Sequence, residues 1–232
     1  EEKKMEEMEV CFLMDRFGYM KLIDKNAYER NKEAVHNENK YVFNCMNTDK
    51  ICIFTDTGKM HTIKAVDIPL GRFRDKGTPV DNLSNYDSSQ ERMLYVAPVG
   101  QLRSDRLLFV TKTSMCKLVE GAEFDVAKRT IASTKLADED ELIFIGSASE
   151  MEQIVLQSHG GCFLRFLTQE VSTMKKTALG VRGMKLADDD YLEHAYLLAG
   201  HPEYTISYHD KEYALNKVRL AKRDTKGIKP RI

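Results

Sequence analysis

The sequence contains no tryptophan, few prolines and no apolar run as long as a membrane span. Its charged start, EEKKMEEMEV, lacks the apolar core of a signal peptide. With 42% hydrophobic and 31% charged residues, the composition is typical of an ordinary folded domain. We therefore expect a cytoplasmic protein, and a chain of 232 residues is long enough to bury a sizeable core.

Cysteine and histidine are too scattered for a metal centre or a disulfide framework. The five cysteines include no Cys-x-x-Cys pair, and four of them lie inside apolar segments. The six histidines lack the paired spacing of a zinc site. The sequence therefore predicts small buried thiols in a reducing compartment and no bound metal.

Recognisable catalytic patterns are missing as well. The chain has no P-loop, no dinucleotide-binding glycine pattern, and no serine with histidine and aspartate at motif spacing. The paired carboxylates Asp188 and Asp189 lie in an acidic segment, which favours a solvated turn over acid–base chemistry. We expect no catalytic residues in this chain.

What the sequence does contain is a degenerate repeat. An apolar run, a polar turn and a second apolar or basic run recur five times, with turns at Gly18, Gly58, Ser114, Gly161 and Lys211. A spacing of roughly 40 to 50 residues is typical of propeller blades with four strands each. The repeat predicts one all-β domain of five blades.

The fourth repeat, Ile154 to Leu186, is the clearest. Its apolar runs Ile154–Leu156 and Cys162–Leu167 are joined by Ser-His-Gly-Gly, the pattern of a β-hairpin. A basic segment follows, in which Gly180 and Gly183 serve backbone conformation. Outside the hairpins we expect a loop at 79–89 and further strands at 41–45, 93–96, 142–145 and 191–198.

Several segments resemble a known family. Ile53 to Leu83, Lys222 to Lys229 and above all Phe163 to Asp190, with EVSTMKKTALGVRGMKLADDD at its centre, resemble the C-terminal domain of the bacterial type IIA topoisomerase A subunit. That is the subunit of DNA gyrase or topoisomerase IV. The resemblance runs from about Val10 to Ile232. It implies a β-pinwheel, a propeller-like disc of four-stranded blades that exchange strands, and five blades are compatible with an open ring.

The resemblance also implies a role. Residues 10–232 would be one non-catalytic domain that binds and bends duplex DNA on its outer rim, and residues 1–9 the remnant of a linker. The cleavage tyrosine, ATP and magnesium belong to other domains, so no cofactor is expected here. The implied partners are double-stranded DNA, the rest of the A subunit and the ATPase B subunit, in the bacterial cytoplasm near the nucleoid.

One departure from the family pattern separates two alternatives. Gyrase has a glycine-rich basic box in the region of Ala27 to Lys40, whereas this chain has no glycine between Gly18 and Gly58. A topoisomerase IV-like domain is therefore favoured, and a divergent gyrase domain is the alternative.

Basic residues at the ends of the hairpins and along the segments after them are the expected phosphate contacts, which position DNA without reading its sequence. The predicted DNA-binding residues are Lys21, Arg72, Arg74, Lys112, Lys117, Lys128, Arg129, Arg165, Lys175, Lys176, Arg182, Lys185, Lys217, Arg219, Lys222 and Arg223.

Two other function classes compete with DNA binding. The formal net charge of −1 suits a protein-interaction propeller, although the absence of tryptophan removes the Trp-Asp signature of the commonest scaffold propeller. A hydrolase with its site in the central channel would need polar groups that converge on the axis, and the innermost runs that we identify are apolar.

Overall fold

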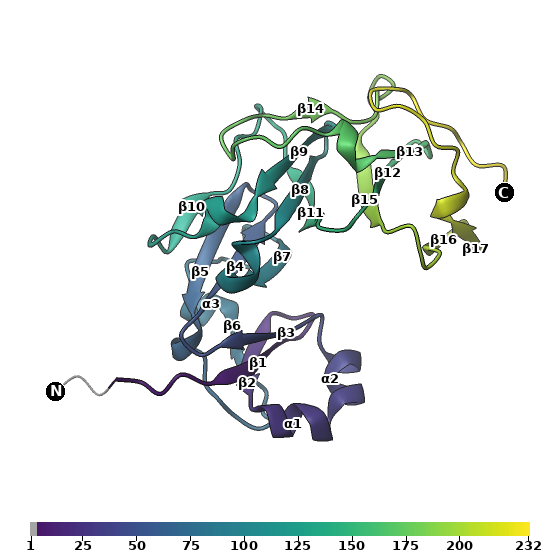
Figure 1. Cartoon of the computed structure of the whole chain (residues 1–232). Helices are drawn as coiled ribbons and strands as arrows, with labels where there is room; N and C mark the ends of the chain where they lie inside the picture. Colours follow the sequence, from purple (N-terminus) through teal and green to yellow (C-terminus); the bar gives the residue numbers. More distant parts are fainter. Residues whose placement is uncertain (1–3) are drawn as a thin grey trace.

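The computed structural model describes residues 4–232, which form five small antiparallel sheets that follow one another along an arc (Figure 1). We call these sheets blades one to five. Blade one has the order β3 (Tyr41–Met46), β1 (Glu9–Met14), β2 (Tyr19–Ile23), β6 (Thr78–Pro79). Blade two has the order β7 (Met93–Pro98), β4 (Lys50–Thr55), β5 (Lys59–Lys64), β10 (Thr130–Ala132).

Blade three also has four strands, whereas the last two blades have fewer. Blade three has the order β11 (Leu142–Ser147), β8 (Arg106–Thr111), β9 (Met115–Glu120), β14 (Val181–Arg182). Blade four contains β15 (Leu192–Leu198), β12 (Gln153–Ser158) and β13 (Phe163–Leu167). Blade five contains β16 (Thr205–Tyr208) and β17 (Lys211–Ala214). The expected strands at 41–45, 93–96, 142–145 and 191–198 are confirmed.

The outer strand of each complete blade comes from the next repeat in the chain. Strand β6 follows β5 of blade two, β10 follows β9 of blade three, and β14 follows β13 of blade four. This exchange confirms the expected all-β pinwheel. It also explains why the expectation of four strands fails in the last two blades. The segment after β17 pairs with β13 at the isolated bridges Phe163–Ile228 and Arg165–Leu220 without forming a strand, and among residues 4–232 only β16 pairs with β17.

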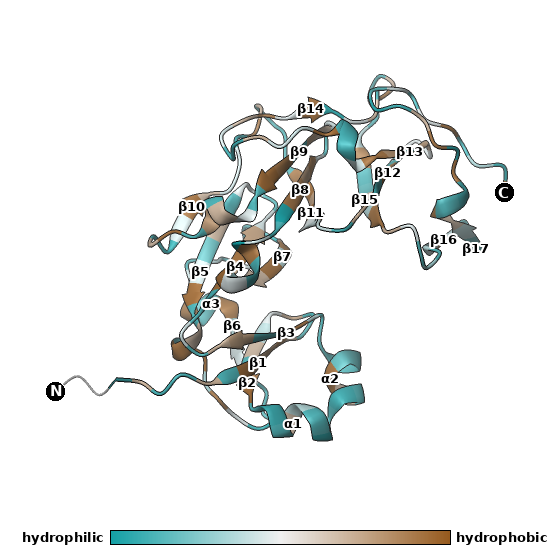
Figure 2. Cartoon of the chain, viewed as in Figure 1, coloured by the Kyte–Doolittle hydropathy of each residue, from teal (hydrophilic) through white to brown (hydrophobic). Residues whose placement is uncertain are grey.

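The core lies between the blades because their central strands are buried on both faces. In β1, Phe12 and Met14 pack against Ile51 and Ile53 of blade two. The next blades repeat this arrangement, so that apolar layers lie between all successive blades. Figure 2 shows hydrophobic residues concentrated on such strands as β8 and β9.

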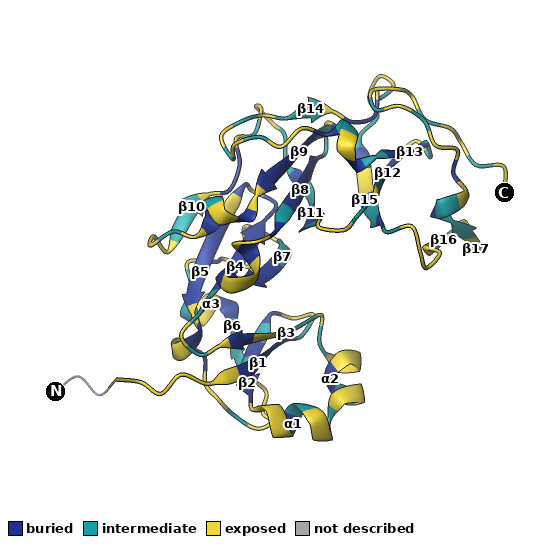
Figure 3. Cartoon of the chain, viewed as in Figure 1, coloured by how far each residue is buried: buried dark blue, intermediate teal, exposed yellow. Residues whose placement is uncertain are grey.

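The free face of blade one is covered by two helices, α1 (Lys25–Arg30) and α2 (Lys32–Glu38). Asp24 caps α1 by accepting a hydrogen bond from the Ala27 amide at 2.7 Å. Ala27 and Val35 are buried against the other face of β1. We call α1 and α2 the helical cap, and Figure 3 shows its outward surface exposed. No secondary structure was predicted for this region.

Among residues 4–232, two further short α-helices lie outside the cap. They are α3 (Val80–Leu83) and α4 (Val99–Leu102). Helix α3 lies within the segment 79–89 that was expected to be a loop. No helix of residues 4–232 is long and apolar enough to cross a membrane.

The hairpin turns share one backbone conformation, with φ of +84° at Gly18, +76° at Gly58, +71° at Ser114 and +86° at Gly161. The fifth turn position is Asp210, with φ of +60°, and not Lys211 as expected, because Lys211 begins β17. His209 and Asp210 both adopt positive φ, as a two-residue turn between antiparallel strands requires. This fifth hairpin therefore closes without glycine.

The cysteines are free, as expected. Cys11, Cys45, Cys52 and Cys116 are buried, and Cys162 is half-buried. Burial raises the pKa of the Cys11 thiol to about 11 and that of the Cys116 thiol to about 12. The segment expected to be a linker remnant, Glu1 to Glu9, begins outside the described residues, and residues 4–8 have no regular secondary structure.

Candidate nucleic-acid interface

The exchanged segments form the outer edges of the blades and are called arms here. The first arm (69–79) lies along β2, the second (125–135) along β5, the third (172–185) along β9 and the fourth (218–231) along β13. Backbone hydrogen bonds hold them, among them Leu22 N to Pro69 O at 3.2 Å, Thr62 N to Arg129 O at 2.8 Å and Ala221 N to Arg165 O at 2.8 Å. Each arm is therefore a continuation of the sheet at the rim.

Most of the predicted DNA-binding residues lie on this rim and are exposed. The exposed predicted residues within the arms are Arg72, Arg74, Lys128, Arg129, Lys175, Arg182, Lys185, Arg219 and Lys222. Lys217 directly precedes the fourth arm and is also exposed. Lys176 and Arg223 lie on arms but are half-buried, and Lys112 lies in the hairpin turn of blade three.

Some of these cations already have acidic partners. Arg182 forms an ion pair with Asp224, with Nη2 at 3.3 Å from Oδ2, and the hydrogen bond to Asp224 raises the Arg182 pKa. Lys217 Nζ lies 3.6 Å from Glu203, and Lys112 Nζ lies 3.7 Å from Glu141. Exposed pairs of this kind are weak, so a phosphate can replace the carboxylate.

Lys117 is not placed to touch a ligand at the rim, contrary to the prediction. Its side chain is 2% exposed, and its Nζ donates hydrogen bonds to the carbonyl oxygens of Lys176 at 2.8 Å and Ala178 at 2.6 Å. Burial lowers the pKa of Lys117 to about 8. The lysine is buried because its neighbours on that face of β9 and β8, Val119 and Phe109, belong to the core.

Two other predicted contacts are also engaged inside the protein. Lys21 Nζ donates to Phe73 O and, at 2.7 Å, to Asp75 O. Arg165 donates from Nε to Val218 O at 2.6 Å and from Nη1 to Gln153 Oε1 at 2.7 Å. Both side chains thus bind the backbone of an arm, and Arg165 also binds the Gln153 side chain of β12, rather than projecting from the rim.

A basic groove lies between the second and third arms. It has a volume of about 710 Å³, and its lining includes Lys128, Lys135 and Lys176 together with the hydroxyl residues Thr130 and Thr177. Lys135 was not among the predicted contacts. The sequence carried a signal for it, because Lys135-Leu-Ala-Asp repeats the Lys185-Leu-Ala-Asp of the next blade.

The predicted DNA-binding residues leave out other exposed cations of the arms. Lys76 lies over the ring of Tyr19, 4.9 Å from its centroid. Lys226, Lys229 and Arg231 are exposed on the fourth arm. Their positions in the glycine-containing segments that follow a hairpin could have identified them in the sequence.

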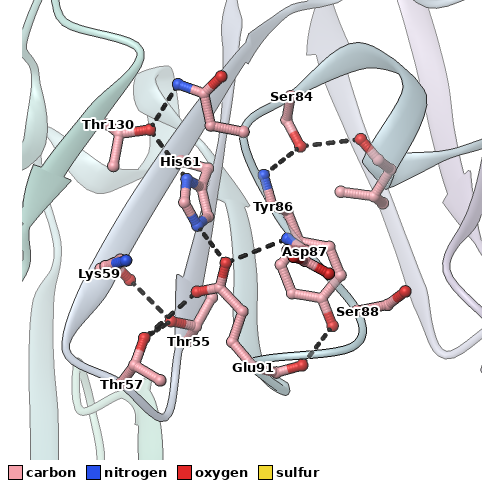
Figure 4. Close-up of polar contacts among 12 residues, drawn as sticks. Thr55, Thr57, Lys59, His61, Ser84, Tyr86, Asp87, Ser88, Glu91 and Thr130 are labelled. Atoms are coloured by element: carbon pink, nitrogen blue, oxygen red, sulfur yellow. Dashed lines mark hydrogen bonds and ion pairs between the residues drawn. The ribbon is translucent and has the colours of Figure 1, made fainter.

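Blade two contains a buried polar network (Figure 4). His61 Nε2 lies 2.8 Å from Glu91 Oε2, and His61 Nδ1 lies 2.9 Å from Thr130 Oγ1 of the second arm. Burial of Glu91 opposes its ionisation, but hydrogen bonds from neighbours that include Asp87 and His61 lower its pKa overall. The network ties the second arm to the loop that precedes β7.

The acidic segments also hold turns in place. Asp140 Oδ2 accepts a hydrogen bond from Thr113 Oγ1 at 2.6 Å, and Asp190 Oδ1 accepts one from the Gly160 amide at 2.9 Å. Asp189 has φ of +62° and is exposed, in agreement with the turn interpretation of Asp188 and Asp189. Within residues 4–232, no cluster of three or more histidine, cysteine or acidic side chains could hold a metal ion.

A cavity of about 530 Å³ is lined by residues of the first four blades. Its acidic lining residues are engaged in protein contacts. Glu91 binds His61, and Glu193 Oε1 lies 2.6 Å from His159 Nδ1. Asp15 accepts hydrogen bonds from two backbone amides of its own turn, and Asp81 Oδ2 accepts one from the Ser88 amide at 2.8 Å. The cavity thus gives no support to the hydrolase alternative.

Exchanged outer strands and an arc of blades define the chain as a propeller-like domain of the pinwheel type. A family model described as DNA gyrase C-terminal domain, beta-propeller, matches residues 49–88, 105–149 and 152–199. These segments make up more than half of the chain, and the chain belongs to this family. The resemblance seen in the sequence is thereby confirmed.

Curated relatives of the chain include gyrase A subunits. The chain is 25% identical over 236 residues to that of Ureaplasma parvum, which covers 95% of this chain and 28% of the relative. It is 27% identical over 240 residues to that of Mycoplasma pneumoniae, with coverage of 95% and 28%. The chain therefore spans less than a third of the length of these relatives.

Solved structures share the fold. The C-terminal domain of a DNA topoisomerase IV matches with a TM-score of 0.84 and 22% identity, covering 97% of this chain and 73% of that one. The E. coli ParC C-terminal domain matches with a TM-score of 0.74 and 13% identity, covering 96% of this chain and 94% of that one. A DNA gyrase A C-terminal domain matches with a TM-score of 0.63 and 18% identity, covering 95% of this chain and 76% of that one.

Proposed function

We propose that this chain is the non-catalytic part of a type IIA topoisomerase A subunit that binds duplex DNA on its rim and bends it for strand passage. The observation that carries the proposal is that all four arms bring exposed cations to the outer edges of successive blades. DNA cleavage and ATP hydrolysis then belong to the rest of the A subunit and to the B subunit, in the bacterial cytoplasm at the nucleoid. The domain itself needs no cofactor.

The distribution of charge supports this proposal despite the formal net charge of −1. Residues 211–232 hold eight basic side chains and two acidic ones, Glu212 and Asp224. Much of the acid lies elsewhere, in the turns around Asp140 and Asp190. DNA affinity depends on the basic side chains that lie at the contact surface, because each phosphate that they neutralise releases a counterion from DNA.

A topoisomerase IV-like role is favoured over a gyrase-like one. The helical cap fills the region where gyrase has its glycine-rich basic box. The topoisomerase IV domain also matches with a higher TM-score, 0.84, than the gyrase A domain, 0.63. A divergent gyrase domain is the second candidate, supported by relatives that carry the name gyrase A.

A salt titration of binding to a random duplex of about 40 base pairs tests the proposal. With roughly six to eight phosphates engaged, the slope of log K against log salt concentration should be about −5 to −7. Replacing Lys128, Arg129 and Lys135 with Met should lower the magnitude of the slope by about 2 to 3. Absence of binding at low salt would contradict the proposal and favour a protein-interaction propeller.

Ligation of a nicked circle in the presence of the domain separates the two candidates. A topoisomerase IV-like domain should bend DNA and leave the linking number nearly unchanged. A large change in linking number would show chiral wrapping and favour the divergent gyrase.

A further inference from the structure

Two arms do not run straight along their blades but swing outward in matched loops. The loops 71–77 and 174–180 each follow a parallel bridge to the blade, Leu22–Leu70 and Leu118–Thr173, and each returns as an antiparallel outer strand, β6 or β14. We call them the basic loops, because their exposed side chains include Arg72, Arg74, Lys76 and Lys175.

Each basic loop encloses a lysine that comes from the blade. Lys21 lies one residue before Leu22 and donates to the carbonyl oxygens of Phe73 and Asp75. Lys117 lies one residue before Leu118 and donates to those of Lys176 and Ala178. Counted from the bridge, the acceptors are the third and fifth residues in both loops. The same contact is thus built twice, two blades apart.

The other two blades that carry an arm, blades two and four, show what replaces this contact. In blade two the equivalent residue is His61, between Met60 and Thr62, and the second arm pairs directly as β10 without an outward loop. In blade four the equivalent residue is Leu164, which is buried, and the loop 221–227 is tied by Arg223 instead. Arg223 donates to Glu170 O at 3.0 Å and to Arg182 O at 2.8 Å.

We propose that Lys21 and Lys117 are positioning residues, which hold the two basic loops in a fixed outward shape so that the loop cations meet the duplex at set points along the rim. This inference rests on the proposed function. Because the ammonium groups bind backbone carbonyls, they fix the loop whatever its side chains are. DNA bending depends on where phosphate contacts are held, whereas the salt dependence of affinity depends on how many there are.

The test uses the full chain with Lys117→Met and Lys21→Met, which keep the length of the buried stem and remove the donors. Amide hydrogen exchange reports on the loops without DNA. The Ala178 amide donates to Lys175 O at 3.0 Å, and the Asp75 amide donates to Arg72 O at 3.1 Å. We expect exchange of Ala178 in Lys117→Met, and of Asp75 in Lys21→Met, to be about tenfold faster.

DNA readouts then separate a positioning role from direct contact. In both variants the salt slope should stay unchanged, while the bend of a duplex with donor and acceptor dyes at its ends should decrease. Lys175→Met is the matched control, since this exposed lysine lies in the same loop. It should lower the magnitude of the slope by about 0.9 and leave the Ala178 exchange rate unchanged.

Several results would overturn the inference. A slope that falls by about 0.9 in Lys117→Met would mean direct phosphate contact. Unchanged loop exchange would mean that the lysines do not hold the loops, and faster exchange with an unchanged bend would mean that the loop shape does not guide DNA. If neither variant folds, the core rather than the loops requires the lysines. If the parent protein binds no DNA, the proposed function fails, and the exchange data still decide whether the lysines hold the loops.

Discussion

At the scale of single residues, there is a physical reason why glycine is needed at the end of each basic loop. Gly180 has φ of +104°, and a Cβ there would lie 2.6 Å from the carbonyl oxygen of Cys116. Gly77 and Gly227 repeat both features, against Met20 O and Phe163 O at 2.6 Å. The outward loop can rejoin its blade only where no side chain intervenes.

Gly180→Ala should therefore destabilise the domain by about 1 to 3 kcal/mol, because the positive φ and the contact with backbone both disfavour a Cβ. Chemical denaturation measures the free energy of unfolding. Gly200→Ala is the control: its Cβ would meet only the flexible carboxylate of Glu152, at 3.3 Å, and we expect little change. Equal effects of the two substitutions would contradict this explanation.

Lys117 should make stability depend on pH. Its pKa is about 8 in the folded domain against an ordinary value of 10.5. Between these pH values the unfolded chain keeps a proton that the folded chain has lost, so this group makes stability rise with pH from about 8 to about 10.5. The melting temperature of Lys117→Met relative to the parent should therefore fall between pH 7.5 and pH 10. A constant difference would show that Lys117 titrates alike in both states.

The burial of Lys117 also shows the limit of reading residues from the sequence. A lysine between Cys116 and Leu118 looks like the exposed position of an alternating strand, and the prediction treated it so. In a propeller-like stack the central strands are buried on both faces, so alternation no longer separates core from surface. The repeated pairs Lys21-Leu22 and Lys117-Leu118 were the signal that both lysines share one structural task.

At the scale of elements, the hairpins were predictable and the helical cap was not. Each hairpin has a turn residue with positive φ between two apolar runs, a strong local pattern. The cap buries little more than Ala27 and Val35, too few apolar residues in too short a segment for a helical period to stand out. Its task, covering Cys11 and Leu13, is set by the blade and not by its own sequence.

The helical cap can be tested with the substitution Val35→Asp. Val35 is fully buried, so an aspartate there should detach α1 and α2 from blade one. Alkylation of Cys11, mapped by mass spectrometry, should then accelerate at least tenfold, while Cys116 between blades three and four stays protected. Asn37→Asp places the same charge on the exposed side of α2 and should have no effect. Protection of Cys11 in Val35→Asp would show that the cap does not shield this face.

At the scale of the whole molecule, strand exchange couples the blades. If the strand pairing of one blade is disrupted, the outer strand of its neighbour is disturbed as well. In solenoids, by contrast, the repeats only stack on one another. We expect a single thermal transition with equal calorimetric and van't Hoff enthalpies. This measurement also tests whether residues 10–232 form one domain. Two well-separated transitions would indicate independent parts.

Strand exchange also sets the unit in which this architecture can be cut or recombined. The sheet of blade three runs from Arg106 in β8 to Arg182 in β14, and this stretch encloses the β12–β13 hairpin of blade four. A segment cut at the boundaries of one sequence repeat thus includes the outer strand of the neighbouring blade and lacks the outer strand of its own blade. Transplanting one blade between homologues requires two consecutive repeats, so chimaeras joined at the repeat boundaries would mix the two parents within every sheet.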